Sequence, residues 1–257
     1  MPGRPPVMEP RIRVRRAQVR KQEGRKRLRV LVAVLVVAAV AGAAWGTVRS
    51  PLVDVDHIVV EGALETGPAP VATASRVHRR AAMVDIDEGA VGRRLRALPW
   101  VRSAVVQREW PGTVRIRIVE RVPVAMTPNG GGGWALVDVE GRVLKWLATP
   151  EPGVLAIGGL PPAGAPGVML APEARGLLDV AEAVPSELRP RLTGAILDAA
   201  GITLGLAPAG TILLGGAEDL GAKLRAAQMV LAGVDTTGVG VIDVRFPATP
   251  TLTRVQP

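Results

Sequence analysis

The 257-residue sequence contains no cysteine and no tyrosine, and it has only one phenylalanine and two histidines. Without cysteine the chain can form no disulfide and offers no thiolate to a substrate or a metal. His57 and His78 each lack a second ligand at a helical or hairpin spacing, which argues against a metal site. We therefore expect neither a metal nor any other cofactor.

The motifs of common enzymes are also missing. The glycine-rich stretch Asn129–Gly133 is not followed by the Gly-Lys-Ser/Thr that a phosphate-binding loop requires. The acidic residues near Asp54 and Asp85 fit a strand entrance and a helix start, and no pattern pairs them across a cleft as sugar hydrolysis requires. None of the serines lies in a Gly-x-Ser-x-Gly or Ser-x-x-Lys motif; they are Ser50, Ser75, Ser103 and Ser186. The sequence thus predicts a protein that is not an enzyme and has no small-molecule substrate.

One long run without charge stands out against this background. Val30–Val48 holds 19 residues, which as a helix would span about 28 Å, close to the hydrocarbon thickness of a bilayer. Trp45 lies near its end, where an aromatic ring suits the headgroup level. The run predicts a single transmembrane helix over residues 30–48.

A cleaved signal peptide is the alternative interpretation of this run. Ala41-Gly42-Ala43 resembles a cleavage site for such peptides. However, the apolar run is longer than the roughly 7–15 residues of a signal-peptide core, and a long basic stretch precedes it. We favour the membrane anchor.

Residues 1–29 carry eleven basic and two acidic side chains, a net charge of +9 that equals the formal charge of the whole chain. A basic cluster beside a transmembrane helix predicts a cytoplasmic tail that is attracted to anionic lipid. The tail has no aromatic residue for base stacking, so we do not expect nucleic-acid binding. The rest of the chain is then extracytoplasmic.

The first outer domain is predicted at residues 52–123, with the element order strand, helix, helix, strand, strand. Helices of this order should cover one face of a small sheet. Asp85 or Asp87 can cap the second helix, and Pro99 ends it. The expected elements are strand Asp56–Glu61, helix Pro68–Ala82, a helix through Leu98, strand Trp100–Trp110 and strand Thr113–Glu120.

Specific residues of this domain resemble the POTRA domain of FtsQ/DivIB bacterial cell-division proteins. The matching string is Leu98-Pro99-Trp100-Val101, Ala104-Val105-Val106, Arg108, Trp110-Pro111, Thr113-Val114, Ile116, Ile118 and Glu120-Arg121-Val122-Pro123-Val124-Ala125. Trp100, Arg108 and Trp110 are open to two interpretations, as partner contacts or as packing residues. The string is more specific to the division family than the order of elements is.

A second outer domain is predicted at residues 124–250, followed by a tail at 251–257. Its strongest helix is Asp219–Gly233, and Val239–Phe246 should return as a strand. Three blocks are similar to the same family: Val137-Asp138 with Gly141 and Val143, Leu213-Leu214-Gly215-Gly216 with Leu220 and Lys223-Leu224, and Ile242-Asp243-Val244-Arg245-Phe246-Pro247. The resemblance implies an α+β chain whose second domain is mixed, with a mainly antiparallel sheet.

The family resemblance also implies a function. FtsQ-type proteins are non-enzymatic scaffolds at the division septum, where they link early and late division proteins and bind the membrane proteins FtsB and FtsL. The FtsB segment is added beside the last strand of the second domain, which maps here to Val241, Ile242, Asp243, Val244, Arg245 and Phe246. An unpaired sheet edge makes this mode physically reasonable, with Arg and aromatic side chains as anchors. The alternative is that Phe246 plugs the base of the sheet and Arg245 is a solvated charge.

Two other classes compete with a division scaffold that works with FtsB, FtsL and further divisome membrane proteins. A POTRA-bearing envelope transport or assembly factor should carry repeated POTRA units or a C-terminal barrel, and the sequence shows neither pattern. A wall enzyme anchored in the membrane should carry a nucleophile or a metal set, and the sequence shows neither. We expect an inner- or plasma-membrane protein enriched at the septum.

Overall fold

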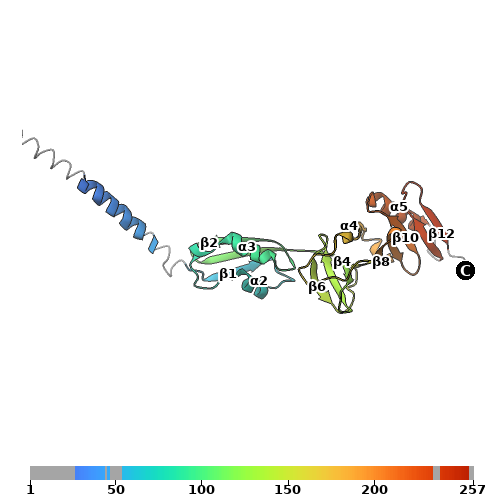
Figure 1. The fold of residues 1–257 in the computed structure, drawn as a ribbon, viewed down its shortest axis with the longest axis horizontal. Coiled ribbons are helices and arrows are strands. Elements are labelled where there is room, and N and C mark those ends of the chain that lie inside the picture. The colour runs from blue at the N-terminus through green and yellow to red at the C-terminus, as the bar shows by residue number, and fades with distance from the viewer. Residues whose placement is uncertain (1–26, 44, 47–53, 234–237, 255–257) are drawn as a thin grey trace, which may run out of the picture. The chain divides into compact units, whose positions relative to one another are not determined.

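The computed structural model describes residues 27–43, 45–46, 54–233 and 238–254 (Figure 1). Residues 27–43 and 45–46 are helical with exposed side chains. Within the described part of the chain, no helix has both the length and the apolar character needed to cross a membrane. The predicted span Val30–Val48 includes residues 44, 47 and 48, which lie outside the described residues, as does most of the basic tail. The span therefore stays a prediction.

Residues 54–120 build a three-stranded sheet with two helices, in the predicted order. The sheet has the strand order β1-β3-β2. The elements are β1 (His57–Glu61), α2 (Pro68–Ser75), α3 (Glu88–Arg96), β2 (Val101–Glu109) and β3 (Thr113–Glu120), with a short 3-10 turn at Met83–Asp85. Helix α2 is shorter than expected, because Arg76 adopts a left-handed conformation (φ 55°) that ends it.

Capping and alternation explain these elements. The Asp87 carboxylate accepts the N–H of Ala90 at 2.9 Å and begins α3, so of the two caps considered, Asp85 and Asp87, it is the second that forms. In β3 the side chains of Val114, Ile116 and Ile118 are buried, while Arg115 and Arg117 lie on the other face and both pair with Glu61. The period-two alternation of a strand therefore separates the core face from the charged face.

Residues 123–254 build a nine-stranded sheet in the order β12-β11-β10-β9-β8-β7-β4-β5-β6. The pairs β4–β7, β7–β8 and β10–β11 are parallel and the others are antiparallel. The strands are β4 (Pro123–Pro128), β5 (Trp134–Asp138), β6 (Val143–Leu147), β7 (Leu155–Gly158), β8 (Leu192–Asp198), β9 (Gly201–Leu206), β10 (Thr211–Gly215), β11 (Val239–Asp243) and β12 (Thr251–Arg254). The helices are α4 (Arg175–Ala183) and α5 (Leu220–Gly233), with 3-10 turns at Pro172–Ala174 and Arg189–Arg191. A mixed, mainly antiparallel sheet is what the sequence predicted.

The turn between β5 and β6 is closed by the side chain of Asp138. Its Oδ1 accepts the N–H of Glu140 at 3.0 Å and of Arg142 at 2.8 Å. Gly141 has a φ of +87°, a conformation that L side chains rarely adopt. This accounts for the Asp and Gly of the hairpin motif in physical terms.

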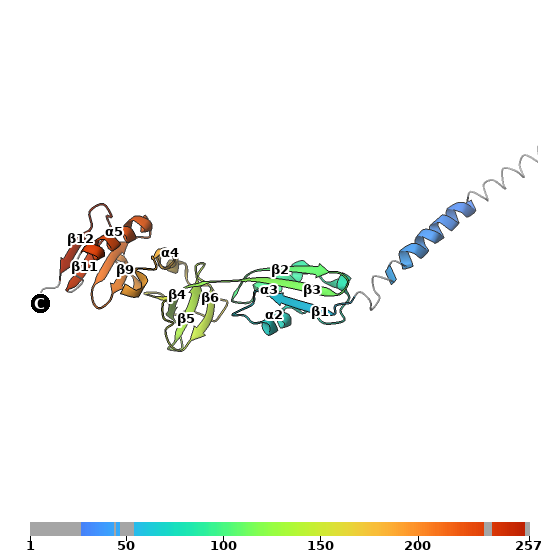
Figure 2. The same cartoon turned by 180° about the vertical axis from the view of Figure 1, so that it is seen from behind.

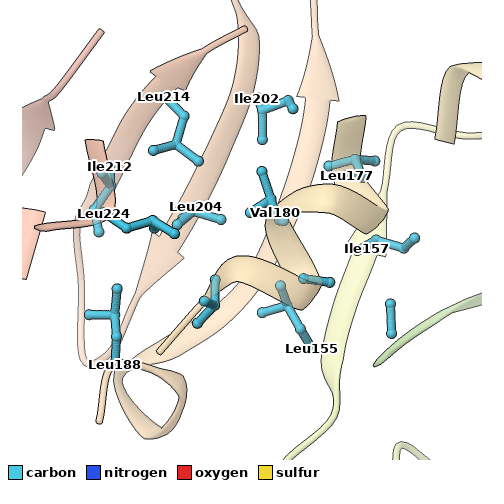
Figure 3. Close-up of a cluster of buried hydrophobic side chains, with 14 of the residues drawn as sticks. Leu155, Ile157, Leu177, Val180, Leu188, Ile202, Leu204, Ile212, Leu214 and Leu224 are labelled. Carbon is cyan, nitrogen blue, oxygen red and sulfur yellow. The ribbon is translucent and has the colours of Figure 1, made fainter. Parts of the chain in front are cut away.

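The larger core of this sheet lies between the strands and the two helices. Figure 3 shows Leu177 and Val180 of α4 pointing toward Ile202 and Leu204 of β9, and Leu224 of α5 completes the cluster. A charged side chain is also buried in this domain: Lys223 of α5 is 2% exposed. Its ammonium donates to the carbonyl of Gly216 at 3.0 Å and to Glu218 at 2.8 Å, which satisfies a charge that would otherwise be costly to bury.

The C-terminal end of the sheet differs from the prediction. The expected strand Val239–Phe246 ends at Asp243, and a further strand, β12, lies in the segment expected to be a tail. Pro247 lies within the turn that connects β11 to β12, and Pro250 directly precedes β12. The prediction that Val241–Phe246 is the last strand is therefore wrong, because the chain turns back and adds one more antiparallel strand.

Candidate partner-binding edge

Strand β12 forms one end of the nine-stranded sheet (Figure 2). Its neighbour β11 is paired on both sides. On one side Val241 is in register with Thr211 of the parallel strand β10, and on the other it is in register with Thr253 of β12. The edge open to a further strand at this end is thus that of β12 rather than that of β11.

Main-chain directions can be assigned along this edge. The N–H of Val244, directly after β11, donates to Leu213 of β10 at 3.0 Å. Successive residues of a strand point their N–H and C=O groups to opposite sides, so those of Asp243 point toward β12. Asp243 is in register with Thr251, and the N–H and C=O of the next residue, Leu252, therefore point to the open edge. Leu252 offers the ladder groups that an added strand needs.

The six residues predicted to bind a partner separate into three pairs in the structure. Ile242 and Val244 are fully buried in the core. Val241 and Asp243 are partly buried on the opposite face of β11. Arg245 and Phe246 lie beyond the strand and are exposed. Only the latter pair has most of its side chain available to a partner.

Arg245 is held in a defined position although its side chain is 51% exposed. Its N–H and its Nε each donate to Oδ1 of Asp243 at 3.0 Å, and its Nη2 donates to Oδ2 at 2.6 Å. The guanidinium hydrogen bonds hold the pKa of Asp243 below its ordinary value, and the Asp243 carboxylate raises the pKa of Arg245. The stem of Arg245 lies over Gly215, where a Cβ would come within 3.1 Å of its Cγ.

Phe246 is 75% exposed, so it does not plug the base of the sheet. Its carbonyl accepts the N–H of Thr249 at 3.0 Å, which closes the turn into β12. An exposed phenylalanine and a fixed arginine in the segment that leads into an edge strand are a combination suited to peptide recognition. Sequence reasoning missed β12 itself, although Thr251-Leu252-Thr253 after two prolines is an alternating, β-favouring segment.

The remaining candidates lie between residues 54 and 120, on the strands, turns and loops of the first domain. Trp100 is partly buried, and Trp110 is 54% exposed. Arg108 donates from Nη1 to the carbonyl of Met83 at 3.5 Å. His57 and His78 are both exposed. Among the residues that the structure describes, no group of three His, Asp or Glu side chains is placed to hold a metal ion.

Comparison with known protein families gives two matches that cover most of the chain. Residues 53–121 match the POTRA domain of FtsQ type. Residues 125–245 match the C-terminal domain of cell division protein FtsQ/DivIB. The boundary between the two matches coincides with the change from the three-stranded to the nine-stranded sheet.

Several curated proteins are similar to this chain, and each is named cell division protein FtsQ. The protein of Rhodothermus marinus is 36% identical over 54% of this chain and 51% of its own length. That of Mycolicibacterium smegmatis is 31% identical over 79% of this chain and 58% of its own length. The matches thus span about half the length of these relatives. Taken with the two domain matches, they show that the chain belongs to the FtsQ/DivIB family of cell-division proteins, which are not enzymes.

Proposed function

We propose that this chain is a membrane-anchored scaffold of the bacterial divisome that acts at the septum. In this proposal it links early and late division proteins by binding FtsB and FtsL. The family membership supports the general role. The N-terminal apolar run and its basic flank support an anchor with the N-terminus in the cytoplasm.

The proposed binding mode is strand addition to the open edge of β12. The observation that carries it is the register of β11 and β12, which assigns the main-chain groups of Leu252 to the open edge. The exposed Arg245 and Phe246 lie in the segment that leads into β12. An incoming extended segment would pair with β12, and its side chains would contact Phe246 and the outer face of the Asp243–Arg245 pair. Val241–Asp243 of β11 would then pair with β12 and hold it in place, while β12 itself would pair with the partner.

Affinity measurements on the full chain in detergent, with FtsB–FtsL from the same source, test this mode. Phe246→Ala should weaken binding by roughly 10- to 100-fold if the ring is an interface anchor. Met229→Ala is a matched control, because Met229 is 68% exposed on α5. Equal affinity of the Phe246 variant and the wild type would contradict the proposed mode.

The divisome role has its own test, independent of the binding mode. An N-terminal fluorescent fusion imaged in dividing cells of the source organism should form a band at midcell. An even signal around the cell periphery would contradict the septal role and would favour an envelope transport or assembly function.

A further inference from the structure

Three segments of the three-stranded domain meet at the end where the chain enters it. The N–H of Val55 donates to Ala81, and the N–H of Arg80 donates back to Val55, at 2.9 and 2.8 Å. The N–H of Asp56 donates to the carbonyl of Gly112 at 2.8 Å. These bonds tie the loop after α2 and the β2–β3 turn to the residues just before β1, and the three segments belong to one compact unit.

The β2–β3 turn approaches the entering chain closely. A Cβ on Gly112 would lie 2.6 Å from Oδ2 of Asp56 and 2.9 Å from the carbonyl oxygen of Asp54. The turn is therefore held against the chain entrance, and Trp110 beside it is kept at this end of the domain. The Trp110 side chain is 54% exposed, although tryptophan side chains in folded proteins are highly buried on average.

Basic side chains surround the same entrance. Arg79 and Arg80 are exposed, and within the described residues their guanidiniums form no hydrogen bond or ion pair. The acidic residues of this end are Asp54, Asp56, Asp85 and Glu109, of which Asp85 and Glu109 are engaged in interactions. Val84, 37% exposed, adds an apolar group on the same loop. The two available arginines are adjacent on the loop after α2, so their positive charge is concentrated in one place.

The short stretch of chain between the predicted membrane span and Asp54 indicates that this end of the domain faces the membrane. Asp54 follows Val48, the last residue of the predicted span, by six residues. Six residues reach at most about 20 Å even when fully extended. The entrance, with its arginines and its exposed tryptophan, is therefore always within reach of the lipid headgroups. Arginine and tryptophan are the residue types that favour the membrane–water interface.

We propose that this end of the domain, with Arg79, Arg80 and Trp110 at its surface, docks on anionic lipid headgroups of the membrane that anchors the chain. Docking would fix the direction in which the outer domains leave the membrane. The docking proposal rests on the proposed membrane anchorage of the chain but not on any division partner.

The absence of native cysteine allows a direct test with single-cysteine variants of the full chain in lipid nanodiscs. A fluorophore on Val84→Cys should be quenched by lipids that carry a nitroxide at the headgroup, more strongly with phosphatidylglycerol than with phosphatidylcholine alone. Leu64→Cys is the matched control: Leu64 is 91% exposed and follows the opposite end of β1. Quenching at this position should stay low in both lipids.

Neutralising Arg79 and Arg80 distinguishes binding of the domain to the lipid from mere proximity to it through the membrane anchor. Arg79→Gln with Arg80→Gln should lower the ratio of docked to undocked domain by roughly fivefold for each arginine. Arg225→Gln, an exposed arginine on α5, should leave quenching unchanged. Circular dichroism should report the same fold for all variants.

Two results would overturn the proposal. Quenching at position 84 that does not depend on lipid charge or on the two arginines would show tethering without docking. Equal quenching at positions 64 and 84 would show that the domain has no preferred face toward the membrane. Failure of the chain to assemble into nanodiscs would instead contradict the membrane anchorage, so the two claims fail separately.

Discussion

Arg245 binds the carboxylate of Asp243, two residues earlier in the chain, with both its main-chain N–H and its guanidinium. The pair fixes a half-exposed cation at the point where β11 ends and the chain turns toward β12. In the family motif both residues therefore have a structural reason to occur together. The partner-facing role proposed for Arg245 would depend on this internal bond.

The first prediction concerns pH. The pKa of Asp243 is lowered in the folded protein, so its contribution to stability is present above its ordinary value of 3.8 and is lost as pH falls through the lower folded value. Because Arg245 is half-exposed, the contribution should be less than about 1 kcal/mol. Urea unfolding of the wild type and Asp243→Asn should show a small difference in stability at pH 6 that shrinks progressively as the pH is lowered below 3.8. A difference that persists in acid would contradict this assignment.

The second prediction concerns Glu120, the glutamate that opens the Glu-Arg-Val-Pro motif. Its carboxylate accepts the N–H groups of Leu64 at 3.1 Å, Glu65 at 2.9 Å and Thr66 at 2.7 Å. Burial acts to raise the pKa of Glu120, but these N–H groups outweigh it and hold the pKa below its ordinary value. Glu120→Gln should cost roughly 1–3 kcal/mol in the free energy of unfolding, measured by urea titration at pH 7.

The loss of stability caused by Glu120→Gln should also depend on pH. Because the folded pKa is the lower one, the stabilisation by the charged carboxylate should fade as the wild type is acidified through it. Glu88→Gln, a change of the same type at the start of α3, controls for general charge effects. A Glu120→Gln variant as stable as the wild type at pH 7 would show that the loop does not need the carboxylate.

The third prediction concerns the buried Lys223. Lys223→Met keeps the apolar stem but removes the donor to the Gly216 carbonyl, so it should destabilise the nine-stranded sheet domain by about 1–3 kcal/mol. Arg225→Met, on the exposed side of the same helix, should change stability by less than about 0.5 kcal/mol. Thermal unfolding of the two variants would give the comparison, and equal melting temperatures would rule out a structural role for the lysine.

The fourth prediction concerns the main chain of β12. Leu252→Pro removes an N–H that points to the open edge, so it should weaken partner binding by at least about tenfold while β12 keeps its pairing to β11. Val244→Pro is a different change, because the N–H of Val244 donates to Leu213 inside the sheet. That variant should lose stability as well as binding. Titration of both variants with FtsB–FtsL, alongside unfolding curves, separates the two effects.

Much of the first domain could be predicted from local sequence. The alternation of Val114, Ile116 and Ile118 with Arg115 and Arg117 defined β3 and its core face, and the start of α3 was narrowed to a cap at Asp85 or Asp87. These features depend on residues close in sequence, where hydrophobic period and capping chemistry are decisive.

The edge of the larger sheet could not be predicted in the same way. Whether β11 is terminal depends on Thr251–Arg254, a four-residue strand that pairs with it only through tertiary register. The short segment has one apolar residue, Leu252, and propensity alone does not distinguish such a strand from a tail. The exposure of Phe246 likewise follows from the turn after Asp243 rather than from its residue type.

Hydrogen exchange of β12 tests the central claim most directly. Amide exchange of residues 251–254 should be measured by mass spectrometry on the full chain, alone and with FtsB–FtsL. If the partner adds a strand to this edge, the outward N–H of Leu252 becomes hydrogen-bonded and exchange of this segment slows strongly, while exchange in β6 at the other end of the sheet is unchanged. Unchanged exchange at β12 in a saturated complex would contradict strand addition at this edge.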